Sequence, residues 1–162
     1  KFCSTRRIVK PRAFNAPKHL VYRAWTEPEL VRRWLGANWY PWVVCDMDVR
    51  VGGKYRWVWD LGGPDDERPE GAQGGEMGIS GEYRELVPNE RIVNTERFDE
   101  SWYAGEAIDT LTLEEHDGVT TCTTLVLCES NEAREAMINS GMAEGVEAGY
   151  ACMDEVLAGL SA

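Results

Sequence analysis

Residues 130–160 read SNEAREAMINSGMAEGVEAGYACMDEVLAGL, and this stretch carries the strongest helical periodicity of the chain. Ser130 or Asn131 can begin the helix, because a short polar side chain accepts a hydrogen bond from an otherwise unpaired backbone N–H. Apolar residues then recur every three or four positions up to Leu160, which predicts one buried face. Gly141 indicates a kink between a short helix and a long one. A helix of about 30 residues would be roughly 45 Å long, enough to cover a sheet.

Strands are predicted for most of the chain upstream of this helix. The segment 54–60, KYRWVWD, alternates aromatic residues with Lys, Arg and Val, which is typical of a strand with one buried face. Asp117-Gly118 is a strong signal for a hairpin turn, and Gly52-Gly53 marks another reversal. We expect strands over residues 4–14, 42–51, 54–60, 79–87, 91–98, 106–115 and 119–128.

Two short helices are predicted between the first two strands. Pro17 suits the first turn of a helix over residues 18–25. Thr26, with Glu29 three positions later, forms a capping box that starts the second helix, and Gly36 ends it. Further along, residues 61–75 are rich in Gly, Pro and acidic side chains, so we expect a long mobile loop there.

The order of these elements predicts an α+β architecture. An antiparallel sheet with one apolar face must be covered, and the C-terminal helix is the only predicted element large enough to do so. We therefore expect a curved antiparallel sheet of about six or seven strands wrapped around that helix, with the two short helices after the first strand. A length of 162 residues is typical of one domain, so we expect a single domain over residues 1–162.

Charge and composition narrow the classes of partner. The net charge is −11, which disfavours nucleic acid and anionic membrane surfaces as partners. Residues 1–56 hold twelve Lys or Arg against four Asp or Glu, whereas residues 57–162 hold five against 24, so the two halves are expected to fold against each other. An alternative is that the basic half forms a docking patch for an acidic partner.

Cysteine and histidine usage gives no support for a metal site. The two histidines and five cysteines are scattered, without the close spacing of zinc ligands, so we expect neither a metal nor a cofactor. Most cysteines sit inside apolar patterns, where a free thiol behaves as a small apolar side chain. This usage suits a reducing compartment, so we expect a cytoplasmic protein.

Six phrases in order resemble a known family: FNAP (14–17), AWTEPEL (24–30), RWLG (33–36), DVRVGG (48–53), GEY (81–83) and SGMAEG (140–145). They look like the bacterial SRPBCC proteins called activator of heat-shock protein 90 ATPase homologues, within the START / Bet v 1-like superfamily. The resemblance covers nearly the whole chain. It implies a helix-grip fold, in which a curved sheet grips the C-terminal helix and leaves a cavity between them. The superfamily includes lipid carriers, cyclases and aromatic-ring oxygenase domains, so the fold alone does not define a function.

Seven tryptophans in a chain of this size indicate either a ring-filled core or a ring-lined pocket. The candidate ligand-binding walls are Trp34, Trp57, Trp59, Tyr83, Phe98 and Trp102, and the candidate helix side is Met142, Gly145, Gly149 and Met153. The glycines recur every four residues on the apolar helix face. They leave either open space or room for the helix backbone to approach Trp57 and Trp59.

Catalytic residues are not distinguished by the sequence. Glu82, Glu85, Arg97 and Asp109 lie on predicted strands and could project inward as an acid or base. The pair Asp46 and Asp48 reads as a solvated outer face.

The leading interpretation is that the protein binds a small hydrophobic or aromatic ligand between sheet and C-terminal helix, and is not an enzyme. One alternative is a co-chaperone-like protein-interaction module, which a large apolar patch on the convex face would favour. The other is an enzyme of cyclase or hydrolase type, which a cavity carboxyl with a strongly raised pKa would favour. The oligomeric state is left open between a monomer and a homodimer.

Overall fold

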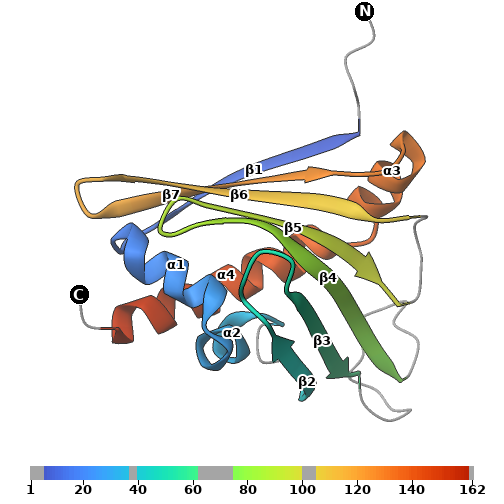
Figure 1. Ribbon diagram of the computed structural model, residues 1–162, viewed down its shortest axis with the longest axis horizontal. Helices are drawn as coiled ribbons and strands as arrows, with labels where there is room; N and C mark the ends of the chain where they lie inside the picture. Colours follow the sequence, from blue (N-terminus) through green and yellow to red (C-terminus); the bar gives the residue numbers. More distant parts are fainter. Residues whose placement is uncertain (1–5, 37–39, 62–74, 100–104, 161–162) are drawn as a thin grey trace, which may run out of the picture.

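The computed structural model describes residues 6–36, 40–61, 75–99 and 105–160 (Figure 1). Within these ranges, seven strands form one antiparallel sheet in the order β1-β7-β6-β5-β4-β3-β2, and four helices accompany it. The elements are β1 (Arg7–Phe14), α1 (Lys18–Thr26), α2 (Pro28–Trp34), β2 (Trp42–Met47), β3 (Lys54–Asp60), β4 (Glu76–Val87), β5 (Arg91–Phe98), β6 (Ala107–His116), β7 (Val119–Leu127), α3 (Asn131–Asn139) and α4 (Met142–Gly159). The helices lie on one side of the curved sheet (Figure 1), which we call its concave face.

The sheet runs as a meander from β2 to β7, and the first strand returns to its far edge. β1 pairs with β7 in a register that joins Arg7 to Leu127 and Phe14 to Thr120. The β6–β7 hairpin turns at Asp117 and Gly118, whose φ angles of 50° and 77° suit the left-handed turn that the Asp-Gly signal predicts. Strand β3 has the bounds expected from its alternation, and so does β5.

Two local predictions about the helices differ from the structure. Thr26 does not cap α2, because its hydroxyl donates to the carbonyl of Tyr22 one turn back in α1, and Glu27 is the N-cap residue without a side-chain cap. The C-terminal segment is not one long helix but two, α3 and α4. Gly141 separates them with a φ of 78°, so the expected kink is present, and Ser130 caps α3 by accepting from the backbone of Ala133.

Two strands also differ in length from the sequence prediction. β2 ends at Met47, because the chain then turns and Gly52 donates its backbone N–H to the carbonyl of Tyr83. β4 begins at Glu76, earlier than expected, since it pairs with β3 from that residue onward. Leu61 donates to the carbonyl of Gly75, and the predicted mobile loop between them, residues 62–74, lies outside the described residues.

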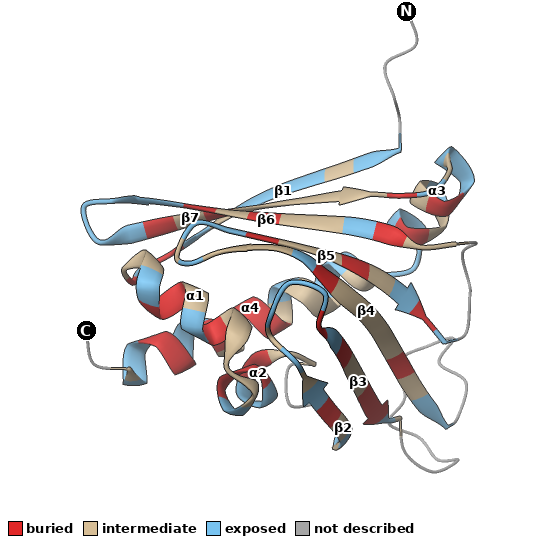
Figure 2. Ribbon diagram, in the orientation of Figure 1, coloured by how far each residue is buried: buried red, intermediate tan, exposed pale blue. Residues whose placement is uncertain are grey.

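The concave face is covered by all four helices rather than by the terminal helix alone, and the apolar core divides into two clusters. Buried positions alternate with more accessible ones along the strands and helices (Figure 2). The first core cluster comprises Phe14, Ala16, Leu20, Val21, Ala24, Leu30, Trp34, Tyr55, Tyr83, Ile92, Leu111, Leu113, Cys122, Tyr150, Met153, Val156 and Leu157. The second core cluster comprises Phe98, Ala107, Cys128, Ala133 and Met137, from β5, β6, the end of β7 and α3.

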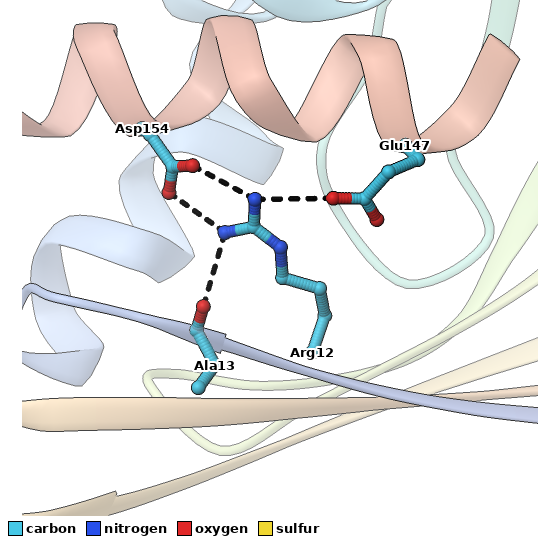
Figure 3. A network of polar contacts seen from close by, with 4 residues as sticks. All are labelled: Arg12, Ala13, Glu147 and Asp154. Atoms are coloured by element: carbon cyan, nitrogen blue, oxygen red, sulfur yellow. Dashed lines mark hydrogen bonds and ion pairs between the residues drawn. The ribbon is translucent and has the colours of Figure 1, made fainter. Parts of the chain in front are cut away.

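Arg12 joins the edge strand β1 to α4 (Figure 3). Its guanidinium donates to both carboxylate oxygens of Asp154, at 2.7 and 2.8 Å, and to Glu147 at 3.3 Å. The same group lies 4.6 Å above the centre of the Phe14 ring, and the Arg12 side chain is only 22% exposed. The basic N-terminal part of the chain therefore contacts the acidic C-terminal part, as the charge distribution predicts.

Arg12→Ala should lower the free energy of unfolding by about 1–2 kcal/mol, because it removes a bidentate ion pair and a cation–ring contact together. Thermal unfolding should report a drop of several degrees. Arg84→Ala is the matched control, since Arg84 is 54% exposed and its nearest carboxylate, Glu82, is 3.8 Å away. Equal melting temperatures for Arg12→Ala and the parent would contradict the assignment of Arg12 as a strand–helix link.

Candidate functional site

Polar side chains occupy the part of the concave face that lies between the two core clusters. On β5, Ile92 of the first cluster and Phe98 of the second share one face, and Asn94 and Glu96 lie between them on that face. On β6, Asp109 pairs with Asn94. The sheet therefore places two carboxyl groups and an amide where a continuous core would have apolar residues.

Glu96 and Asp109 share a hydrogen bond, and burial raises the pKa of each carboxyl. The negative charge of Glu96 raises the pKa of Asp109 further, against the opposing effect of a hydrogen bond from Asn94. Oδ1 of Asp109 is buried and has no hydrogen-bond partner among the described residues. No Lys or Arg in the described ranges pairs with either carboxyl. The pair therefore retains a proton to a higher pH than a carboxyl in water would.

Aromatic rings adjoin this carboxyl pair. The Tyr55 hydroxyl donates to the carbonyl of Thr95 and accepts from Asn94 Nδ2 at 3.2 Å. The Tyr55 ring lies over Gly81, where a Cβ would come within 2.6 Å of ring atom Cε1, so the bare backbone is what admits the ring. Ring centres of Trp57 and Tyr83 lie 4.4 and 5.4 Å from that of Tyr55. Burial, and then the charges of the two carboxyls, raise the pKa of Tyr55.

The site lies on the covered face of the sheet but keeps some contact with solvent. Asn94, Glu96, Asp109 and Trp57 all keep intermediate exposure, although they lie on the face that the helices cover. On α4, a Cβ added at Gly145 would meet no atom of the described residues within 4 Å.

The predicted wall residues fall into two groups. Tyr83 pairs with Asn94, Phe98 follows Glu96 on the same strand face, and Trp57 contacts Tyr55, so these three adjoin the carboxyl pair. Trp34 and Trp59 lie elsewhere in close packing: Trp34 donates to the carbonyl of Ala24 at 2.8 Å, and Trp59 packs on Trp42 at 4.7 Å. Trp102 lies outside the described residues.

The four residues predicted for the helix side of the site also fall into different surroundings. Met142 packs against the second core cluster, and Met153 is fully buried in the first. Gly149 is buried, and a Cβ there would lie 3.2 Å from the carbonyl oxygen of Trp34. The helix backbone therefore approaches α2 at this glycine, and not the tryptophans of the sheet. The expected close approach to Trp57 and Trp59 is therefore wrong for Gly149, whereas Gly145 has open space beside the described residues.

Of the four strand residues considered as an acid or base, only Asp109 lies on the concave face. Glu82 lies beside Arg84, Glu85 pairs with Arg91, and Arg97 lines a groove on the opposite face. Glu96 was missed by sequence reasoning. The signal was available in RIVNTERF (91–98), since alternation places Glu96 on the face of Ile92 and Phe98.

The convex face carries an open groove of about 450 Å³. Its lining is dominated by charged side chains, including Lys54, Arg56, Glu82, Arg84 and Arg97. Such a lining does not suit an apolar ligand. For this reason we place the candidate site on the concave face, where rings and carboxyl groups occur together.

The residues that the structure describes contain neither a cluster of metal ligands nor a membrane-spanning helix. Among them, no group of three or more His, Cys, Asp or Glu could hold a metal ion. None of their helices has both the length and the apolar character needed to cross a membrane.

A curved antiparallel sheet folded over a C-terminal helix, with two short helices after the first strand, defines a helix-grip domain of the SRPBCC superfamily. The family model for Activator of Hsp90 ATPase homolog 1-like protein matches residues 15–158, and the chain belongs to this family. The family resemblance and the α+β helix-grip prediction are both confirmed.

Solved structures of bacterial proteins share the fold. One from Rhodobacter sphaeroides is 31% identical, with a TM-score of 0.82 over 98% of this chain and 95% of that one. One from Chromobacterium violaceum is 26% identical, with a TM-score of 0.73 over 94% and 96%. One from Mycobacterium smegmatis is 22% identical, with a TM-score of 0.78 over 95% and 92%, and shows the fold alone. No curated protein matches the chain.

The raised pKa of Asp109 predicts a pH-dependent stability difference. A carboxyl whose pKa is raised in the folded state stabilises the fold while it is protonated, and this contribution is lost as the pH rises through the folded-state pKa. Asp109→Asn should therefore be more stable than the parent at about pH 8, with a margin that narrows toward about pH 5. Melting temperatures of both proteins across that range provide the measurement.

Asp99→Asn is a control for which the opposite change in stability is expected. The hydrogen bond from Arg56 lowers the pKa of Asp99, so its contribution is present at neutral pH and disappears as the pH falls through the folded-state pKa. This variant should be less stable than the parent at about pH 8. A margin for Asp109→Asn that does not change with pH would show that the carboxyl pair has ordinary pKa values.

Proposed function

We propose that this protein binds a small hydrophobic or aromatic ligand between the concave face of the sheet and α4. The observation that carries the proposal is the interruption of the core at Glu96 and Asp109, two deep residues that keep accessible surface beside aromatic rings. Continuous packing would be expected to exclude such groups, because a buried carboxyl without a countercharge costs several kcal/mol. Ligand sites combine apolar walls with a few converging polar groups, and this part of the face has both.

The helix side supports the same proposal. Gly145 lies on α4 between Met142, which packs on the second core cluster, and Val146, which packs on the first. Glycine costs about 1 kcal/mol relative to alanine inside a helix, so a bare position there needs a reason. Room for a ligand against the helix backbone supplies one.

Gly145→Leu should fill this room and compete with the ligand. Leucine restores roughly 0.8 kcal/mol of helix propensity, so the variant should be at least as stable as the parent. It should lose most of its binding of N-phenyl-1-naphthylamine, a neutral apolar probe whose fluorescence rises in apolar surroundings.

The same substitution at Gly149 is the matched control. There a side chain must displace the backbone of Trp34, and overpacking of this kind typically costs about 1–3 kcal/mol. Gly149→Leu should melt several degrees lower, yet bind the probe while it remains folded. If Gly145→Leu bound the probe as the parent does, the ligand would not lie against this part of α4.

The carboxyl pair also favours an enzymatic role as a second candidate. A carboxyl with a raised pKa can hold a proton near neutral pH and exchange it with a bound molecule. Strong pKa perturbation by burial and a neighbouring charge is typical of catalytic acids and bases. Asp109, assisted by Glu96, would be the proton-transfer group in a reaction of cyclase or hydrolase type.

A row of aliphatic residues on the convex face favours a protein-interaction role as a further candidate. Val9 pairs with Leu125 and Ile108 pairs with Leu127, so these four form one patch across β1, β7 and β6. Val9 is 55% exposed and Ile108 is 37% exposed. Apolar side chains gathered on an exposed sheet face are typical of protein contacts.

A protein-interaction role can be tested with Hsp90, because the family is described as an activator of the Hsp90 ATPase. If the patch contacts Hsp90, the protein should raise the ATP turnover of a bacterial Hsp90, and Val9→Glu with Ile108→Glu should abolish the increase. Val119→Glu is the matched control, because Val119 is 38% exposed but lies at the β6–β7 turn, outside the patch. An unchanged turnover with the parent protein would count against this candidate.

A further inference from the structure

We propose that the ligand carries a protonated amine, which lies against the Glu96–Asp109 carboxyl pair while its apolar part lies among the rings of Tyr55, Trp57 and Tyr83. This inference rests on the proposed ligand-binding function and adds the chemical class of the ligand.

The carboxyl pair has no countercharge among the residues that the structure describes. Neither carboxyl forms an ion pair within the described ranges, and Oδ1 of Asp109 is buried without a hydrogen-bond partner there. Arg134 on α3 acts electrostatically on Cys128, but its guanidinium donates to the carbonyl of Arg7 and to Glu135. A buried carboxylate in this situation is stabilised most by a group that brings both a positive charge and N–H donors.

The groups around the carboxyl pair suit a cation and disfavour an anion. The groups that face Asp109 from neighbouring elements are Glu96 on β5, Tyr55 on β3, Tyr150 on α4 and Cys128 after β7. Each of them is neutral or negative at neutral pH. The whole protein is also negatively charged, with a net charge of −11, which favours the approach of cations.

Aromatic rings lie beside the carboxyl pair. Tyr55, on which the charges of both carboxyls act, contacts the rings of Trp57 and Tyr83, so the ring beside the carboxyls belongs to a group of three electron-rich rings. An ammonium group over such rings gains a cation–ring attraction, which is stronger where water is excluded. A neutral hydroxyl at the same place would gain only a hydrogen bond.

Binding of an amine would also be linked to proton release. Because burial raises the pKa of both carboxyls, the empty pair retains a proton to a higher pH than free carboxyls would, and a bound ammonium ion favours the ionised form. That proton passes to the buffer when the amine binds, so affinity should rise with pH between about 5 and 8, a range in which a simple alkylamine remains protonated.

The test uses three probes of similar shape and different charge: 2-phenylethylamine, 2-phenylethanol and 3-phenylpropionate. Isothermal titration calorimetry of the full chain should give at least about tenfold tighter binding for the amine than for the alcohol, and weaker binding still for the carboxylate. Titrations in two buffers of different ionisation enthalpy should show that the protein releases protons with the amine and not with the alcohol. This readout needs no variant.

Variants then assign the effect to the pair. Asp109→Asn and Glu96→Gln should each reduce amine affinity about tenfold or more and leave the affinity for the alcohol unchanged. Glu85→Gln is the matched control, since Glu85 pairs with Arg91 on the convex face, and it should bind all three probes as the parent does. Folding of Asp109→Asn is expected because it relieves repulsion in the core.

Two results would overturn the inference, and they differ in what else they affect. If the alcohol and N-phenyl-1-naphthylamine bind but the amine shows no preference, or no proton release, the ligand is not cationic and the proposed function stands. If neither the three probes nor the naphthylamine binds, the proposed ligand-binding function is wrong as well.

Discussion

Tyr150 on α4 is the side chain at which the separate parts of the fold meet. Its ring contacts Phe14 of the edge strand at 5.4 Å, Trp25 of α1 at 6.2 Å and Trp34 of α2 at 6.1 Å. The helix is thereby fixed to the sheet edge and to both short helices at once. Since α4 has only 18 residues and cannot cover the sheet alone, the position of the whole helical layer depends on this aromatic junction. Arg12 secures the same place from outside, because its guanidinium also faces the Tyr150 ring at 6.0 Å.

This junction explains why the candidate site lies where it does. The rings around Tyr150 belong to the first core cluster, and α3 with Met137 builds the second cluster at the other end of the concave face. Ile79 packs against both clusters, yet Glu96 and Asp109 separate them on the neighbouring strands. The helical layer is therefore held firmly at its two ends, so a polar interval between them can be tolerated without loss of the fold.

Sequence reasoning predicted the elements that depend on local signals. Alternation placed β3, Asp117-Gly118 placed a hairpin, and Ser130 placed the start of α3, since each signal lies within a few residues. The candidate site was less accessible to prediction. The role of Gly149 depends on a contact with Trp34, which is more than a hundred residues away in the sequence. The hydrogen bond between Glu96 and Asp109 depends on the register of β5 and β6. Neither tertiary contact has a local signature.

The two faces of the sheet depart from the usual distribution of polar and apolar residues in opposite ways. The covered face carries Glu96 and Asp109, and the uncovered face carries the patch that includes Val9 and Ile108. Exposed aliphatic side chains are common on soluble proteins and cost little, because there is not enough polar surface to cover a domain. A carboxyl pair that is largely withdrawn from water, with no countercharge among the described residues, costs up to several kcal/mol, which is a large fraction of the total stability of a domain. Departures from local rules tend to occur at functional sites, and the costlier departure is the harder one to retain without a function. On this comparison of magnitudes, the concave face has the stronger claim to the function of the protein.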